Sequence, residues 1–107
     1  MPETNGSVCE LCGREGVVLT RHHLIPRRTH RLKRIRRAFD RAEREGAILL
    51  VCRPCHKQIH VLFDEKSLAR DYRSREALLA DPEMARFVAW IADKPPGFVP
   101  RARRRRR

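Results

Sequence analysis

The sequence is poor in aromatic residues and in acidic residues, and each shortage bears on the class of partner. Aromatic side chains make up 6% of the 107 residues, so there are few platforms on which unpaired bases could stack. Lys and Arg number 25 against 13 Asp and Glu, which gives a formal net charge of +12 and a pI of about 11.1. Such an excess predicts a polyanionic partner, with nucleic acid ahead of an anionic membrane. We therefore expect binding led by contacts to the backbone of a duplex.

Long apolar runs and the pattern of a secretory leader are also missing. No stretch of the sequence approaches the length of a membrane span, and residues 1–7 lack a secretory pattern. We expect a cytoplasmic protein with no membrane partner, in a compartment that keeps thiols reduced. A βαβ pattern is missing too, so the two Cys-x-x-Cys units predict metal ligands rather than a thioredoxin-like redox pair.

The cysteines form two pairs, Cys9 with Cys12 and Cys52 with Cys55. A domain of this size buries only a modest core, and small domains often add a structural metal. The Cys-x-x-Cys spacing lets both thiolates of a pair face one ion about 2.3 Å away. We expect the four thiolates to close a structural Zn²⁺ site, whose role is folding free energy rather than catalysis.

Two short strands are expected. Residues 17–20 are apolar and partly β-branched and lead into His22 and His23, and residues 47–51 lead into Cys52. The two strands can pair, which would bring the two cysteine pairs together.

Helices are expected in the rest of the chain. The apolar periodicity predicts one helix over residues 31–45 and another from residue 54 or 55 to about 63. The last third should be helical, over residues 65–72, 75–80 and 82–92, with N-caps at Asp64, Ser74 and Asp81. The pattern is that of a small α+β protein with a helical C-terminal extension.

Three histidines suggest a second metal site. His56 and His60 lie one turn apart on a predicted helix, so their imidazoles can converge on one ion, and His22 on the neighbouring strand could supply a third ligand. A three-imidazole site with an open position is what a metal-assisted hydrolase requires. An unperturbed histidine, with a pKa of about 6.5, suits a proton acceptor at cellular pH. One of His22 and His23 could therefore bind the metal while its neighbour faces a water.

Residues 21–26, Arg-His-His-Leu-Ile-Pro, and residues 50–60, Leu-Val-Cys-Arg-Pro-Cys-His-Lys-Gln-Ile-His, resemble the two halves of an HNH endonuclease. The resemblance covers residues 9–63. It implies a ββα-metal core, also called a His-Me finger, with a structural zinc held by the cysteine pairs. It further implies hydrolysis of DNA phosphodiester bonds to a 5′ phosphate and a 3′ hydroxyl, in a prokaryotic or phage setting.

By the same resemblance, His23 is the general base, and His22, His56 and His60 are the ligands of a catalytic divalent metal. Three imidazoles should favour Mn²⁺, Ni²⁺, Co²⁺ or Zn²⁺ over Mg²⁺, which prefers oxygen ligands. We divide the chain into a nuclease core over residues 1–63, a helical extension packing on it over residues 64–97, and a disordered basic tail over residues 98–107.

One position departs from the family pattern. The family's middle Asn, which orients the base histidine, would fall near Ala47, whose side chain cannot form a hydrogen bond. Asp40, Glu43 or Glu45 could orient His23 instead. The departure favours an alternative from another class, a non-catalytic zinc module that binds nucleic acid. An RNA-directed nuclease is a third option, and the oligomeric state is left open.

Basic residues cluster between the two halves of the motif. The planar fork of arginine suits phosphate geometry, and contacts of this type position a nucleic-acid backbone without reading its sequence. His30 lies among them, and we expect it to be a solvated residue rather than a substrate or loop contact. The expected DNA-binding residues are Arg27, Arg28, Arg31, Lys33, Arg34 and Arg37, with Arg36 beside them.

Overall fold

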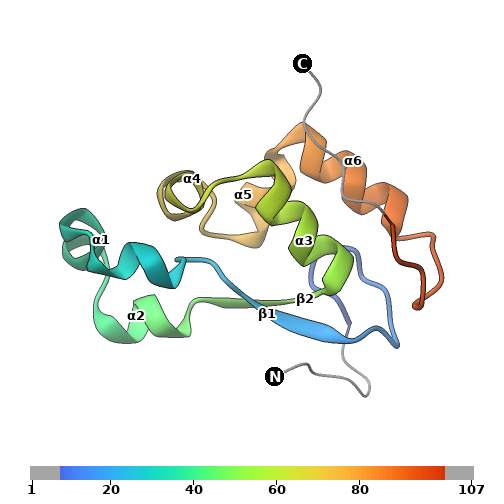
Figure 1. Ribbon diagram of the computed structural model, residues 1–107, viewed down its shortest axis with the longest axis horizontal. Helices are drawn as coiled ribbons and strands as arrows, with labels where there is room; N and C mark the ends of the chain where they lie inside the picture. The colour runs from blue at the N-terminus through green and yellow to red at the C-terminus, as the bar shows by residue number, and fades with distance from the viewer. Residues whose placement is uncertain (1–7, 101–107) are drawn as a thin grey trace.

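The computed structural model describes residues 8–100 and builds them around a two-stranded antiparallel sheet (Figure 1). Strand β1 (Leu19–His23) pairs with β2 (Ile48–Cys52), with Leu19 opposite Cys52 and His22 opposite Leu49. The expected pairing of the two strands is confirmed, although β1 begins two residues later than expected and includes both histidines. The expectations for residues 1–7 and 101–107 fall outside the described residues.

The segment between the strands folds as three short helices, so the single helix expected over residues 31–45 is wrong. The 3₁₀ helix η1 (Arg27–Arg31) precedes α1 (Lys33–Ala38) and α2 (Arg41–Gly46). The chain is extended at Phe39, and α2 restarts from a capping box. Asp40 accepts a hydrogen bond from the main-chain N–H of Glu43 (2.8 Å), and the Glu43 carboxylate accepts one from that of Asp40 (2.9 Å).

Four helices follow the sheet: α3 (Arg53–Leu62), α4 (Glu65–Asp71), α5 (Arg75–Ala80) and α6 (Pro82–Ile91). The predicted N-caps are confirmed, because Asp64, Ser74 and Asp81 each accept a hydrogen bond from the main-chain N–H three residues later. Among residues 8–100, no helix combines the length and the apolar character that crossing a membrane requires.

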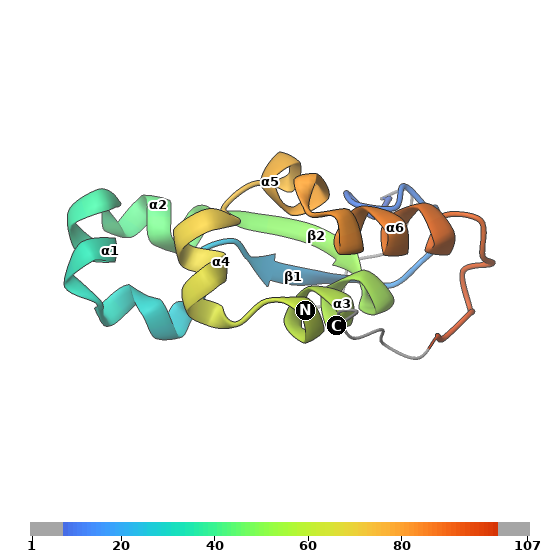
Figure 2. The same cartoon turned by 90° about the horizontal axis from the view of Figure 1, so that it is seen from above.

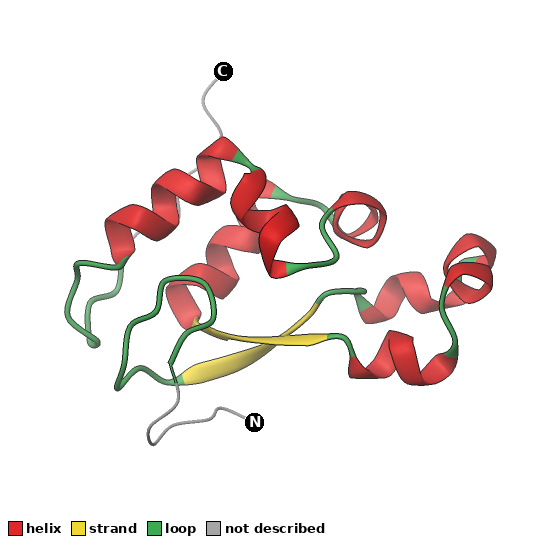
Figure 3. Ribbon diagram, turned by 180° about the vertical axis from the view of Figure 1, so that it is seen from behind, coloured by secondary structure: helices red, strands yellow, loops and turns green. Residues whose placement is uncertain are grey.

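The molecule is flat, with extents of 42 × 38 × 19 Å. In Figure 1, α3, α5 and α6 lie above the two strands, and α1 and α2 lie beyond one end of the hairpin. From above, α4 sits between that end and α3 (Figure 2). Seen from behind, the loops before β1 and after α6 gather at the opposite end of the hairpin (Figure 3).

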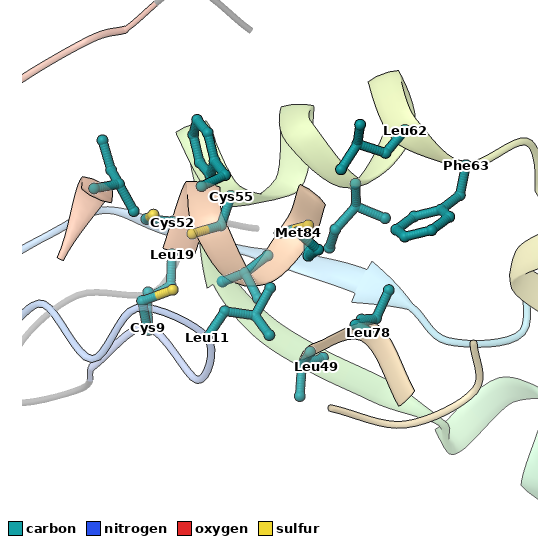
Figure 4. Packing of buried hydrophobic residues seen from close by; sticks show 14 of the residues in the cluster. Cys9, Leu11, Leu19, Leu49, Cys52, Cys55, Leu62, Phe63, Leu78 and Met84 are labelled. Atoms are coloured by element: carbon teal, nitrogen blue, oxygen red, sulfur yellow. The ribbon is translucent and has the colours of Figure 1, made fainter. Parts of the chain in front are cut away.

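The main hydrophobic core is built around cysteine side chains. Cys9, Cys52 and Cys55 lie among buried residues of the sheet, α3 and α6, including Leu19 and Met84 (Figure 4). Residues of α5 and α6 therefore share one core with the strands and α3. Phe98 packs against this core, with its ring 5.7 Å from that of Trp90, so the disordered tail predicted from residue 98 onward is wrong at this position.

A smaller cluster holds the α1 end of the molecule. Ile25, Ile35 and Ala69 are buried together, and Phe39 and Ala47 pack against them. This cluster anchors α1 and α4 to the chain that leaves β1.

Candidate metal centres

The four cysteine sulfurs lie within 4.8 Å of one another, close enough to bind one metal ion. The strand pairing sets Cys52 opposite Leu19, and the main-chain N–H of Glu10 donates to the carbonyl of Leu50 (2.9 Å), which holds the first cysteine loop against β2. That loop turns at Gly13, whose φ of 77° is readily adopted only by glycine. The donor set fits the structural zinc that the sequence predicts.

The thiols form a hydrogen-bonded group of their own. The Sγ atoms of Cys12 and Cys52 are 3.8 Å apart. Hydrogen bonding to Cys52 lowers the pKa of the Cys12 thiol, whereas hydrogen bonding to Cys12 raises the pKa of the Cys55 thiol. Without a bound cation, only some of the four cysteine sulfurs can be deprotonated to thiolates, because their negative charges repel one another. A bound divalent ion would stabilise all four thiolates together.

Arg14 adds a cation next to the sulfurs, at a position that no sequence pattern indicated. Its guanidinium donates to the Sγ of Cys52 (3.3 Å) and to the carbonyl of Pro95 (2.9 Å), and the side chain is buried. It therefore links the cysteine group to the segment after α6.

The predicted histidine ligands also come together. His22 on β1 and His56 and His60 on α3 offer ring nitrogens that lie within 4.8 Å of one another. The ring centroids are separated by 5.4 Å for His22 and His56, 5.5 Å for His22 and His60, and 5.1 Å for His56 and His60. The i, i+4 spacing on the helix aligns His56 and His60, and the strand pairing presents His22 to them.

His22 is the buried member of this cluster. It has no exposed surface, and neither ring nitrogen has a hydrogen-bond partner among residues 8–100. Burial, followed by the charges of His56 and His60, lowers its pKa to about 3, so the ring is neutral. An unsatisfied buried polar group costs roughly 1–3 kcal/mol. A divalent transition ion would satisfy one nitrogen, and neutral imidazole is the form that binds it.

The outer side of the histidine cluster is hollowed. A hollow of about 260 Å³ is lined by His56 and His60 together with Arg53 and Lys57 of the same helix. Both basic side chains are exposed, and their charges favour an anion next to the imidazoles. Arg53 and Lys57 are not among the site residues predicted from the sequence, although positions 53, 56, 57 and 60 lie on one helical face and could have revealed them.

His23, the expected base, ends β1 and is half-buried. Strand alternation turns it away from His22, and it lies outside the three-histidine cluster. Its pKa is lowered by burial and then by the positive charges of Arg27, His30 and Arg21. The pKa of His56 is lowered by burial, by His60 and then by His23. His23 is thus neutral near physiological pH and electrostatically coupled to the cluster.

The carboxylates proposed to orient His23 are engaged elsewhere. Asp40 and Glu43 form the capping box of α2, and Glu45 accepts a hydrogen bond from Arg41 (3.2 Å). Within residues 8–100, none of these three carboxylates forms a hydrogen bond with His23. That expectation is not confirmed.

Main-chain contacts hold the chain that follows His23. The N–H of Leu24 donates to the carbonyl of Ala47 (2.9 Å), which continues the strand pairing by one step.

His30 is half-buried, and its Nε2 donates to the carbonyl of Ile25 (2.8 Å). The expectation that His30 is solvated is therefore wrong, and it is a loop contact.

The basic residues form an exposed surface on η1 and α1. Thr29 and Ile35 point inward and are buried, while the cations around them face solvent. We call this the basic surface, and its residues are Arg27, Arg28, Arg31, Lys33, Arg34, Arg36 and Arg37.

Comparison with known proteins provides one relative. No family model matches the sequence, and no solved structure matches it. Uncharacterized protein YisB of Bacillus subtilis (strain 168) is 40% identical over 99 residues, which cover 90% of this chain and 84% of that protein. The chain therefore belongs to the same family as YisB of Bacillus subtilis.

Proposed function

We propose that this protein is a metal-dependent endonuclease of the HNH type that hydrolyses DNA phosphodiester bonds. The convergence of His22, His56 and His60 beside a hollow lined by Arg53 and Lys57 is the observation that carries it. A buried imidazole with two unpartnered nitrogens is costly in a purely structural role. It is expected where a metal completes the site.

The order of elements supports a ββα-metal core. One ligand lies on β1, the paired strand β2 leads directly into α3, and α3 carries the other two ligands. The cysteine group braces the start of the same helix through Cys52 and Cys55, and in this proposal it holds the structural zinc. The three imidazoles would hold a second divalent ion.

Imidazole ligands suit Mn²⁺, Ni²⁺, Co²⁺ or Zn²⁺ better than Mg²⁺. When bound, such an ion supplies Lewis-acid stabilisation of the charge that develops on the phosphate. Arg53 and Lys57, which line the hollow, would hold the substrate phosphate beside the imidazoles.

His23 is the proposed base. A neutral imidazole accepts a proton from water as the water oxygen bonds to phosphorus. The bond between phosphorus and the 3′ oxygen then breaks, and that oxygen takes up a proton from solvent. The products are a 5′ phosphate and a 3′ hydroxyl. The lowered pKa of His23 keeps its ring able to accept the proton near neutral pH.

The basic surface is the proposed DNA contact. It lies on η1 and α1, directly after the strand that carries His22 and His23. Its arginines present planar donors to phosphates, which favours binding along a duplex backbone.

A plasmid cleavage assay across Mg²⁺, Mn²⁺, Ni²⁺, Co²⁺ and Zn²⁺ tests this function. Wild type should nick the plasmid with at least one transition ion. The His23→Ala variant should lose cleavage while it keeps both metal sites. Lys66→Ala, an exposed change on α4, is prepared in parallel and should cleave like wild type. Equal cleavage by His23→Ala would reject its role as base.

Ala47 favours the second candidate, a non-catalytic zinc module that binds nucleic acid, because no side-chain amide supports His23 from this position. Metal counting separates the two. One tightly bound zinc per chain, with no second ion in excess Mn²⁺ or Ni²⁺ and DNA binding without cleavage, would establish the module. Matched DNA and RNA duplexes in the cleavage assay distinguish the two nucleic acids.

A further inference from the structure

Thr20 lies two residues before His22, on the face of β1 that α3 covers. Its Oγ1 is 2.8 Å from the Nδ1 of His56 and 3.1 Å from the carbonyl oxygen of Val51. Val51 is the residue directly opposite Thr20 in the sheet. A single hydroxyl therefore joins the two strands to one of the three clustered imidazoles.

The chemistry of the hydroxyl fixes the direction of both contacts. A threonine hydroxyl has one proton to donate, and a main-chain carbonyl can only accept. The contact with Val51 therefore uses the proton of Thr20, and Oγ1 must accept from His56. The Nδ1 of His56 thus carries the hydrogen. A neutral imidazole has only one N–H, so the lone pair on Nε2 is free.

We propose that Thr20 is a positioning residue of the histidine site, which sets the tautomer and ring orientation of His56 so that Nε2 is the atom offered to a metal. The inference rests on the metal site of the proposed function. Thr20 suits this role because its branched side chain has few rotamers, and the strand pairing fixes its main chain. Metal-binding imidazoles commonly donate their other N–H to such a partner.

His56 differs in this respect from His22. Both nitrogens of His22 are without a hydrogen-bond partner among residues 8–100, so burial alone holds that ring. His56 is only partly buried, and its hydrogen bond to Thr20 supplies the orientation that burial does not. The pairing of β1 with β2 therefore also determines how His56, on α3, orients its ring.

The first test is the tautomer of His56 in wild-type protein with zinc in the cysteine site and no second ion. Long-range ¹H–¹⁵N spectra distinguish a protonated from an unprotonated ring nitrogen. We expect the hydrogen on Nδ1. A hydrogen on Nε2 would overturn the proposal without the need for any variant.

The second test compares Thr20→Val, which keeps the shape and removes the hydroxyl, with Thr20→Ser, which keeps the hydroxyl. Ni²⁺ is titrated into the zinc-loaded proteins by calorimetry. Thr20→Val should weaken Ni²⁺ binding by about 10- to 100-fold, the usual effect of removing such a partner. Thr20→Ser should bind close to wild type. Zinc content and circular dichroism confirm that the variants fold.

The outcomes separate this proposal from the nuclease function. If Thr20→Val weakens Ni²⁺ binding and loses the Nδ1–H form, Thr20 has the proposed role even where wild type cleaves no DNA. If the plasmid is cleaved but Thr20→Val matches wild type in Ni²⁺ affinity and tautomer, the nuclease stands and the role of Thr20 is rejected. Equal weakening in Thr20→Ser would also reject it, because packing rather than the hydroxyl would then be responsible.

Discussion

Three cysteines occupy positions at which a core of this size would ordinarily hold aliphatic residues, namely Cys9, Cys52 and Cys55. Each is almost completely buried and packs with Leu19 in the main cluster. The sulfurs are therefore packing groups of the core as well as candidate metal ligands. Metal release would leave four thiols sharing protons in the centre of the core, so folding and zinc binding should be strongly coupled.

Replacing Cys55 with Ser tests this coupling. A serine hydroxyl does not ionise and is a poor zinc ligand, so we expect the variant to lose the structural zinc. The free energy of unfolding should fall by about 4 kcal/mol or more, because the loss of a structural metal belongs to the most damaging class of substitution. Zinc per chain and urea denaturation measure the two effects.

Val18→Ser is the matched control for that substitution. Val18 lies in the loop that follows the first cysteine pair but is 41% exposed, so the same new side chain should leave one zinc per chain. A full complement of zinc in Cys55→Ser would contradict the four-cysteine site.

The sequence predicts the candidate metal ligands because their spacing is local. Cys-x-x-Cys and His-x-x-x-His each place two donors on one turn, and a single strand pairing then joins the halves. The supporting residues are different. Arg14 contacts Pro95 across 81 positions, and Thr20 contacts His56 across 36. No local pattern specifies such partners, so only the fold reveals them.

At the scale of elements, the sequence was misleading between the strands. Leu32, Ile35, Phe39 and Ala42 have helical periodicity, which predicts one continuous helix. The chain also contains Asp40-x-x-Glu43, the capping-box pattern that marks a helix start. The structure follows this local signal and begins α2 there. Phe39 then leaves helical geometry and packs against the smaller cluster. Where two signals conflict, the cap that satisfies main-chain N–H groups can outweigh periodicity.

The cap of α6 provides a prediction at the same scale. Asp81 is largely buried and accepts a hydrogen bond from the N–H of Met84 (3.0 Å), and α6 places Met84, Phe87 and Ile91 in the core. Asp81→Ala should lower the free energy of unfolding by about 1–2 kcal/mol, as the loss of an N-cap does. Thermal unfolding should move down by roughly 4–8 °C for each kcal/mol lost.

Asp81→Asn is the control, because the amide oxygen keeps an acceptor for the N–H of Met84. It should lose less stability than Asp81→Ala in urea denaturation. Equal losses in the two variants would mean that the hydrogen bond to Met84 is not what the side chain contributes.

On the scale of the whole molecule, two features are arranged along one flat body. Helix α3 carries His56 and His60 above the sheet, and the basic surface occupies η1 and α1 toward one end (Figure 1). The small α+β architecture follows from local patterns and one strand pairing, so it could be predicted. The packing of α6 on α3 depends on contacts distant in sequence, and the sequence indicated only that the helical extension would pack on the core, without the partner element.

The basic surface predicts how the proposed DNA binding responds to salt. Each phosphate neutralised by a cation releases counterions, so the slope of log K against log[salt] is about −0.9 per contact. Replacing Arg34 and Arg37 of α1 with Gln should make that slope shallower by up to about 1.8 and weaken binding to unrelated duplexes alike. Fluorescence anisotropy with labelled duplexes at several salt concentrations measures it.

The matched control is Arg70→Gln with Arg86→Gln, which removes the same charge from α4 and α6. Both side chains are exposed and already paired, Arg70 with Asp71 and Arg86 with Glu83. If the basic surface binds DNA, this pair should leave the slope close to that of wild type. If both double variants change the slope equally, net charge rather than the surface on η1 and α1 determines binding. The proposed DNA contact would then have to lie elsewhere on the molecule.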